Sequence, residues 1–126
     1  MAASRVLVVD DEPQVRDVLR DYLEGEGYEV REAETALGAL YEVKQHRPAV
    51  VLLDLNMPGA LRGEAVVGAL RDEEVPVIVI TADDDVELAR RTLREGAFDF
   101  VRKPFDLRRV GELVGTAILF GRGGQN

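Results

Sequence analysis

The sequence contains no cysteine. A disulfide framework, thiol chemistry and a cysteine-based zinc site are therefore excluded. No apolar run approaches the ~18 residues that a transmembrane helix needs, and Met1–Ser4, before the first apolar segment, is too short for a signal peptide. We therefore expect a cytoplasmic protein.

Positive charge is also scarce. The 126 residues include 16 lysines and arginines against 24 aspartates and glutamates, which gives a formal net charge of −8. An acidic molecule repels phosphate backbones and anionic lipids, so we expect neither direct nucleic-acid binding nor membrane binding by this domain. Basic residues are concentrated only between residues 90 and 109, where seven of them stand against three acidic residues.

Five short strand patterns alternate with helical patterns along the chain. Residues 50–53 are four consecutive apolar residues followed by Asp54, which is typical of a strand buried on both faces. Further strands are predicted at 5–9, 28–33, 77–80 and 98–102, and helices at about 13–24, 35–46, 64–71, 83–95 and 106–118. We predict one α/β domain over residues 1–120, a doubly wound parallel sheet of five strands in three layers, and a flexible tail at 121–126.

Polar residues stand at the carboxyl ends of four of these strands. All strands of a parallel sheet point the same way, so these residues should meet at one edge, where ligands bind in open α/β sheets. They are Asp10, Asp11, Asp54, Thr81 and Lys103.

Three carboxylates in one crevice repel one another unless positive charge relieves them. A divalent cation and Lys103 are the candidates, and an all-oxygen site with few ligands suits Mg²⁺. Lys103 and the hydroxyl of Thr81 are suited to bind phosphoryl oxygens. A carboxylate left free beside them could attack phosphorus and form an aspartyl-phosphate.

Four motifs coincide with these strand ends. They are Val-Val-Asp-Asp-Glu at 8–12, Leu-Leu-Asp-Leu-Asn-Met-Pro-Gly at 52–59, Ile-Thr-Ala at 80–82 and Gly-Ala-Phe-Asp-Phe-Val-Arg-Lys-Pro-Phe at 96–105. Together they resemble the motifs of response-regulator receiver domains, the phosphoacceptor part of two-component signalling. The resemblance covers about residues 5–120 and implies a flavodoxin-like, chemotaxis-receiver-like sheet of order 2-1-3-4-5.

The resemblance also implies the roles of the site residues. Asp54 accepts a phosphoryl group from a phosphohistidine on a sensor histidine kinase or phosphotransfer protein. Thr81 and Lys103 bind the phosphoryl oxygens. The implied Mg²⁺ ligands are Asp11 and Asp54 directly, the backbone carbonyl of Asn56, and Asp10 partly through water.

Further residues around this site are implied to control its output. Phe100 matches the aromatic residue that swings inward when Thr81 moves, and the peptide bond before Pro104 is usually cis in the family. Asn56 and Asp83 flank the phosphorylation site at positions that set how fast water attacks the phosphoryl group.

The loop after Pro58 departs from the family pattern, which reads Gly, an apolar residue, an acidic residue and Gly. Here Gly59-Ala60-Leu61-Arg62-Gly63 contains a basic residue and one extra residue. This loop borders the metal site. Because it departs from the family pattern, the resemblance predicts neither its conformation nor its influence on partner choice.

The basic residues between 90 and 109 fall on the fourth helix and the start of the fifth. In the family, the surface of the fourth helix, fifth strand and fifth helix reads out phosphorylation, often by dimerisation. The resemblance therefore implies a phosphorylation-dependent homodimer or docked partner; the alternative is that arginines only solvate an amphipathic face. The residues are Arg90, Arg91, Arg94, Arg108 and Arg109.

Two other functions remain open. A degenerate receiver would act only as a protein-interaction module, but it would be expected to lack the acidic pair, Asp54 or Lys103. A Mg²⁺-dependent phosphohydrolase with an Asp nucleophile, similar to haloacid-dehalogenase-like proteins, would carry Asp-x-Asp after the first strand, whereas Asp10 and Asp11 are adjacent. A receiver catalyses only its own phosphorylation and dephosphorylation and is not a metabolic enzyme.

Overall fold

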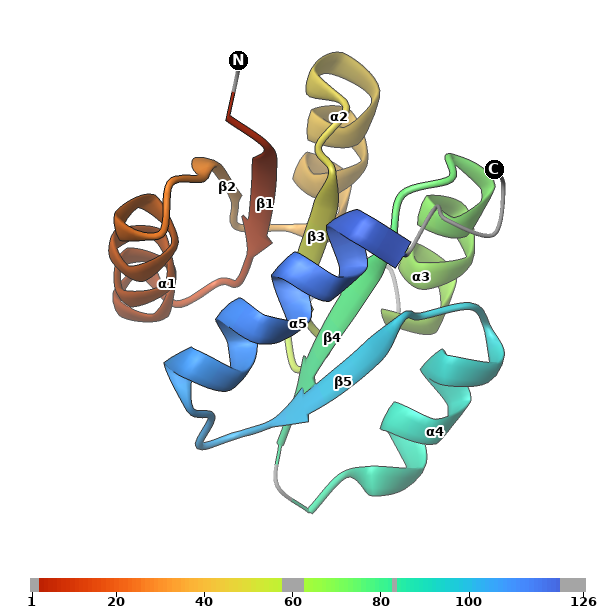
Figure 1. Ribbon diagram of the computed structural model, residues 1–126. Coiled ribbons are helices and arrows are strands. Elements are labelled where there is room, and N and C mark those ends of the chain that lie inside the picture. Colours follow the sequence, from red (N-terminus) through yellow and green to blue (C-terminus); the bar gives the residue numbers. More distant parts are fainter. Residues whose placement is uncertain (1–2, 58–62, 83, 121–126) are drawn as a thin grey trace.

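Strands and helices alternate strictly along the chain (Figure 1). The computed structural model describes residues 3–57, 63–82 and 84–120, so the tail at 121–126 lies outside the described residues. The elements are β1 (Arg5–Val9), α1 (Pro13–Gly25), β2 (Glu29–Ala33), α2 (Ala36–His46), β3 (Val50–Asp54), α3 (Gly63–Asp72), β4 (Val77–Thr81), α4 (Val86–Arg94), β5 (Asp99–Arg102) and α5 (Leu107–Phe120).

The strands form one parallel sheet of order β2-β1-β3-β4-β5. This confirms the predicted flavodoxin-like topology. The central strand β3 is buried over its whole length, as its apolar run predicts, whereas β2 at the edge stays largely half-exposed.

Helices cover both faces of the sheet, which gives the predicted three layers (Figure 1). On one face, α1 and α5 pack through Leu19, Leu23, Val110 and Val114. On the other face, α2, α3 and α4 pack over side chains such as Leu7 and Leu53. Apolar side chains alternate between these two cores along each central strand, so β3 is held from both sides.

Local signals set several helix ends. Thr35 caps α2 by accepting a hydrogen bond from the Gly38 N–H at 2.9 Å, and Asp106 accepts one from the Arg108 N–H at 2.8 Å before α5. Gly96 follows α4 with φ +113°, a backbone conformation that glycine adopts without strain. The fourth helix starts at Val86 rather than near Asp83, since Asp85 occupies the N-cap position.

Within the described chain, no helix has both the length and the apolar character needed to cross a membrane.

Candidate functional site

The register of the sheet brings the polar strand ends together. Val9 pairs with Leu53, so Asp10 follows beside Asp54. Asp54 in turn pairs with Ile80, one residue before Thr81. Thr81 pairs with Arg102, one residue before Lys103. Four neighbouring strands thus present their polar residues at one edge, as the sequence predicts.

Asp54 is the buried centre of this edge, with only 2% of its surface exposed. Its Oδ1 accepts a hydrogen bond of 2.9 Å from the backbone N–H of Asn56. Its Oδ2 lies 3.3 Å from the ammonium nitrogen of Lys103. Each carboxylate oxygen therefore has one donor, and the ammonium supplies a compensating charge.

Asp10 is buried beside it, with 1% of its surface exposed. Its Oδ1 accepts a hydrogen bond of 2.9 Å from the Glu12 N–H, but its buried Oδ2 has no hydrogen-bond partner among the described residues. Burial is the main cause that raises the pKa of the Asp10 carboxyl from 3.8 to about 6. The hydrogen bond from Glu12 opposes this rise, and the negative charge of Asp54 adds to it.

Glu12 is a member of the acidic group that the sequence reasoning did not single out. Oxygens of Asp10, Asp11 and Glu12 lie within 4.8 Å of one another, and Asp11 and Glu12 are exposed. Glu12 also lies 3.9 Å from the Lys103 ammonium. Its place directly after the Asp pair was a signal, but only the turn into α1 brings its carboxylate to the group.

The donor set fits a hard divalent cation. A buried oxygen of Asp10 that has no donor in the described part of the chain, beside two exposed carboxylates, is the arrangement that an oxygen-binding cation would complete. Asp54 interacts electrostatically with this group through Asp10.

Lys103 is the basic residue of the edge, and its side chain is 28% exposed. Burial alone would lower its pKa, but the charge and hydrogen bond of Asp54, with the charges of Asp10 and Glu12, outweigh burial and raise it. The peptide bond between Lys103 and Pro104 is cis.

Two polar contacts join this edge to the start of α4. The Thr81 side chain is fully buried, and its hydroxyl lies 3.4 Å from the carbonyl oxygen of Asp85. Asn56 is exposed, and its Oδ1 accepts a hydrogen bond of 2.9 Å from the Ala82 N–H. Asp83, between these contacts, lies outside the described residues, as does the loop at 58–62.

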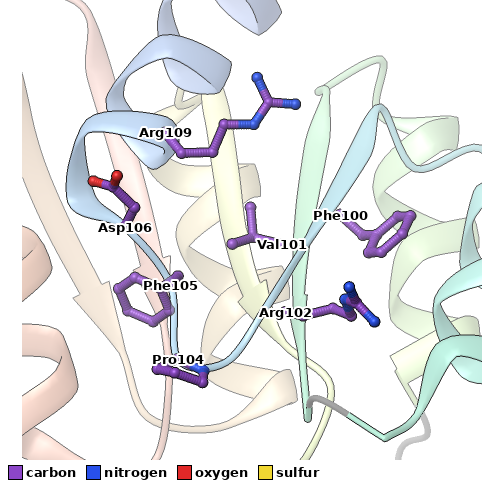
Figure 2. Close-up of a pocket in the computed structure, with 7 residues that line it drawn as sticks. All are labelled: Phe100, Val101, Arg102, Pro104, Phe105, Asp106 and Arg109. Carbon is purple, nitrogen blue, oxygen red and sulfur yellow. The ribbon is translucent and has the colours of Figure 1, made fainter.

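Phe100 of β5 is half-buried against the core under α2, α3 and α4. It also lines a pocket of about 420 Å³ along β5 and the start of α5 (Figure 2). We call this the β5 pocket. Figure 2 shows Phe100 and Arg102 on β5 and Arg109 on α5; the other lining residues are Val101, Pro104, Phe105 and Asp106.

The β5 pocket contains arginines that form no ion pair with a described acidic residue of this chain. Within the described residues, every lysine and arginine forms an ion pair except four. Arg90 pairs with Glu87 at 3.3 Å and Arg91 with Glu64 of α3 at 3.3 Å. The four without a described acidic partner are Arg94, Arg102, Arg108 and Arg109.

The raised pKa of Asp10 predicts a pH-dependent cost of burial. Between about pH 4 and pH 6 the folded protein keeps a proton that the unfolded chain has released, so this carboxyl makes stability fall as pH rises through that window. In metal-free buffer, Asp10→Asn should therefore raise the free energy of unfolding by about 1–3 kcal/mol near pH 7. The gain should shrink towards pH 4. Urea unfolding of parent and variant across this range measures it, and a pH-independent difference would contradict the assignment.

Comparison with known proteins agrees with this geometry. The family model described as response regulator receiver domain matches residues 6–114. The chain is 38% identical over 119 residues to the nitrogen assimilation regulatory protein NtrX of Azorhizobium caulinodans, covering 92% of this chain and 26% of that regulator. It is 32% identical to sporulation initiation phosphotransferase F of Bacillus subtilis, covering 90% of this chain and 93% of that protein.

The solved structures include a receiver domain of similar extent. The receiver domain of NtrX from Brucella abortus superposes with a TM-score of 0.85 at 35% identity, covering 90% of this chain and 97% of that one. The chain spans only about a quarter of the length of the first curated regulators that it matches. The match over residues 6–114 identifies this chain as a member of the response regulator receiver domain family of two-component signalling.

Proposed function

We propose that Asp54 is the phosphoacceptor, and that it receives its phosphoryl group from a phosphohistidine on a sensor histidine kinase or phosphotransfer protein. The observation that carries the proposal is the environment of Asp54: a buried carboxylate at the end of β3, with Lys103 on one oxygen and an acidic group beside it. Its family supports this role, since receiver domains are signalling phosphoacceptors.

The nucleophile in the proposed phosphoryl transfer is the carboxylate of Asp54. A carboxylate oxygen of Asp54 attacks phosphorus and forms an O–P bond as the P–N bond to the donor histidine breaks. The imidazole nitrogen keeps the bonding electrons and takes a proton from solvent. Lys103 is close enough to Asp54 to bind an oxygen of the bound phosphoryl group, and the Thr81 hydroxyl can donate to another.

The acidic group would hold Mg²⁺. Asp10, Asp11, Asp54 and the backbone carbonyl of Asn56 are the proposed ligands, and Glu12 lies next to them. The Oδ2 of Asp10, which no described residue contacts by a hydrogen bond, supports the fit. Bound there, Mg²⁺ would supply positive charge that offsets repulsion between the carboxylates and an incoming phosphoryl group.

Phosphorylation would reach α4 through Thr81. Its hydroxyl now faces the carbonyl of Asp85 at the N-cap of α4, at a distance of 3.4 Å that makes a weak hydrogen bond. Turning this hydroxyl to a phosphoryl oxygen would release that carbonyl. Phe100, which is only half-buried, is the proposed aromatic partner of this movement.

The β5 pocket is the proposed docking surface for the output. It combines apolar side chains with Arg102 and Arg109, and the one acidic residue among its lining residues, Asp106, caps α5. A phosphorylation-dependent homodimer or another partner would therefore bring carboxylates to these arginines. Arg94 and Arg108 likewise have no described acidic partner, whereas Arg90 and Arg91 already have one each.

The two alternatives lack a specific observation in their favour. A pure interaction module has no need of Lys103 against Asp54, and the acidic pair is intact. We therefore propose a cytoplasmic switch that catalyses only its own phosphorylation and dephosphorylation.

Asp54→Asn should abolish phosphorylation because the amide cannot form an acyl phosphate. Incubation with acetyl phosphate and Mg²⁺, followed by intact-mass spectrometry, should add one phosphoryl group to the parent and none to the variant. Asp17→Asn, an exposed change on α1, is the matched control and should be labelled like the parent. Labelling of Asp54→Asn at the parental level would refute the proposal.

Asn56→Ala should change the lifetime of the phosphorylated form several-fold while Mg²⁺ affinity changes less. The proposed ligand of Asn56 is its backbone carbonyl, which the substitution keeps, whereas the side-chain bond to the Ala82 N–H is lost. Decay of the phosphorylated mass after removal of the donor gives the lifetime, and calorimetric titration with MgCl₂ gives the affinity. Asp83→Ala tests the other flanking position in the same way, and parental lifetimes in both variants would contradict lifetime tuning.

Arg102→Glu with Arg109→Glu should weaken phosphorylation-dependent association at least tenfold, because two attractive contacts become repulsive. Sedimentation of beryllofluoride-treated protein measures self-association. The control is Lys44→Glu with Arg47→Glu, which changes the net charge by the same amount. Both residues pair with Glu73 and do not line the β5 pocket, so this variant should associate like the parent. If the treated parent stays monomeric, the homodimer is wrong; if both double variants associate equally, the pocket is not the interface.

A further inference from the structure

Arg16 of α1 contacts the backbone at the end of β1 and side chains at the end of β2. Its Nη1 donates a hydrogen bond of 2.7 Å to the backbone carbonyl of Asp10. Its Nε donates one of 3.1 Å to Oε1 of Glu32, and its Nη2 lies 3.9 Å from Oε2 of Glu34. The side chain is only 14% exposed, so these contacts hold it in one place.

The peptide unit that Arg16 contacts joins the two aspartates of the acidic group. The carbonyl of Asp10 lies in one rigid plane with the N–H of Asp11. The N–H of Asp10 is already fixed by the carbonyl of Ala33 at 3.1 Å, and Oδ1 by the Glu12 N–H. Arg16 fixes the remaining polar group of the Asp10 backbone. Its contact therefore sets how Asp11 is directed relative to Asp10.

We infer that Arg16 is a positioning residue, which holds the peptide unit between Asp10 and Asp11 so that both carboxylates face the cation site. The inference rests on the proposed function, since it concerns the same site. Arg16 acts through geometry, because Glu32 and Glu34 offset its charge. A group that orients a metal ligand commonly changes metal affinity without touching the metal.

Arg20 supplies a matched control one turn further along α1. It shares Glu32 with Arg16, at 3.1 Å, and its other partners are Asp17 and Asp21. None of its hydrogen bonds within the described chain reaches Asp10. Arg16→Met and Arg20→Met both remove an ion pair to Glu32 and both keep an unbranched, helix-compatible stem. Only the first removes the contact to the Asp10 carbonyl.

The test compares Mg²⁺ affinity of the parent and the two variants by calorimetric titration with MgCl₂. Arg16→Met should weaken Mg²⁺ binding about tenfold or more, and Arg20→Met should bind like the parent. Without Mg²⁺, the amide resonance of Asp11 in ¹⁵N spectra should shift in Arg16→Met and not in Arg20→Met. Arg16→Lys, which keeps one cationic donor, should recover part of the affinity and keeps the test open if Arg16→Met fails to fold.

The outcomes separate this inference from the proposed function. If the parent binds Mg²⁺ and Arg16→Met binds it equally well, Arg16 is not a positioning residue and the proposed function stands. If both methionine variants lose affinity equally, the effect belongs to the ion pair with Glu32 and the inference is overturned. If the parent itself binds no Mg²⁺, the metal site of the proposed function fails and this inference fails with it.

Discussion

The burial of two neighbouring carboxylates, Asp10 and Asp54, is the main constraint at the carboxyl edge of the sheet. Both carboxylates are nearly inaccessible to water, and burial together with the negative charge of Asp54 raises the pKa of Asp10. The fold offsets the cost of this burial with N–H groups of the following turns, from Glu12 and Asn56, and with the ammonium of Lys103. One oxygen of Asp10 still has no described donor. The edge is therefore an incomplete arrangement of charge, suited to receive a cation and then an anionic group.

A change at this edge can pass to α4, which has fewer fully buried residues than α5. Only Ala89 and Thr92 of α4 are fully buried, whereas α5 buries four residues in the core. The start of α4 is joined to the site through the Asp85 carbonyl and the neighbouring Ala82 N–H, which contact Thr81 and Asn56. Elements with few buried contacts move at low free-energy cost. A change at Asp54 would thus be expressed first at α4 and then at the adjoining β5.

The sequence predicts this site well where it depends on strand ends and poorly where it depends on side chains crossing between elements. Apolar runs identify the strands, so the meeting of Asp10, Asp54, Thr81 and Lys103 follows from a parallel sheet alone. The contact of Arg16 with the Asp10 carbonyl depends on how α1 is rotated against β2, and sequence spacing does not encode that rotation. The pairing of Arg91 with Glu64 likewise requires the packing of α4 on α3. Such contacts decide which arginines have an acidic partner. The sequence alone does not distinguish the paired arginines from the unpaired ones.

Charge pairing distinguishes two kinds of basic residue on an acidic molecule. Those over β2, α1 and the α2–α3 side neutralise nearby carboxylates, and at the surface such pairs contribute little stability each. Four arginines of α4, β5 and α5 have no described acidic partner, although the chain carries eight more acidic than basic residues. They are Arg94, Arg102, Arg108 and Arg109. Acidic residues are plentiful enough to pair every arginine, so the lack of partners around the β5 pocket is a property of that surface. Its unpaired positive charge would attract an acidic partner of the proposed kind before any contact forms, and the movement of α4 would then decide whether the contact is complete.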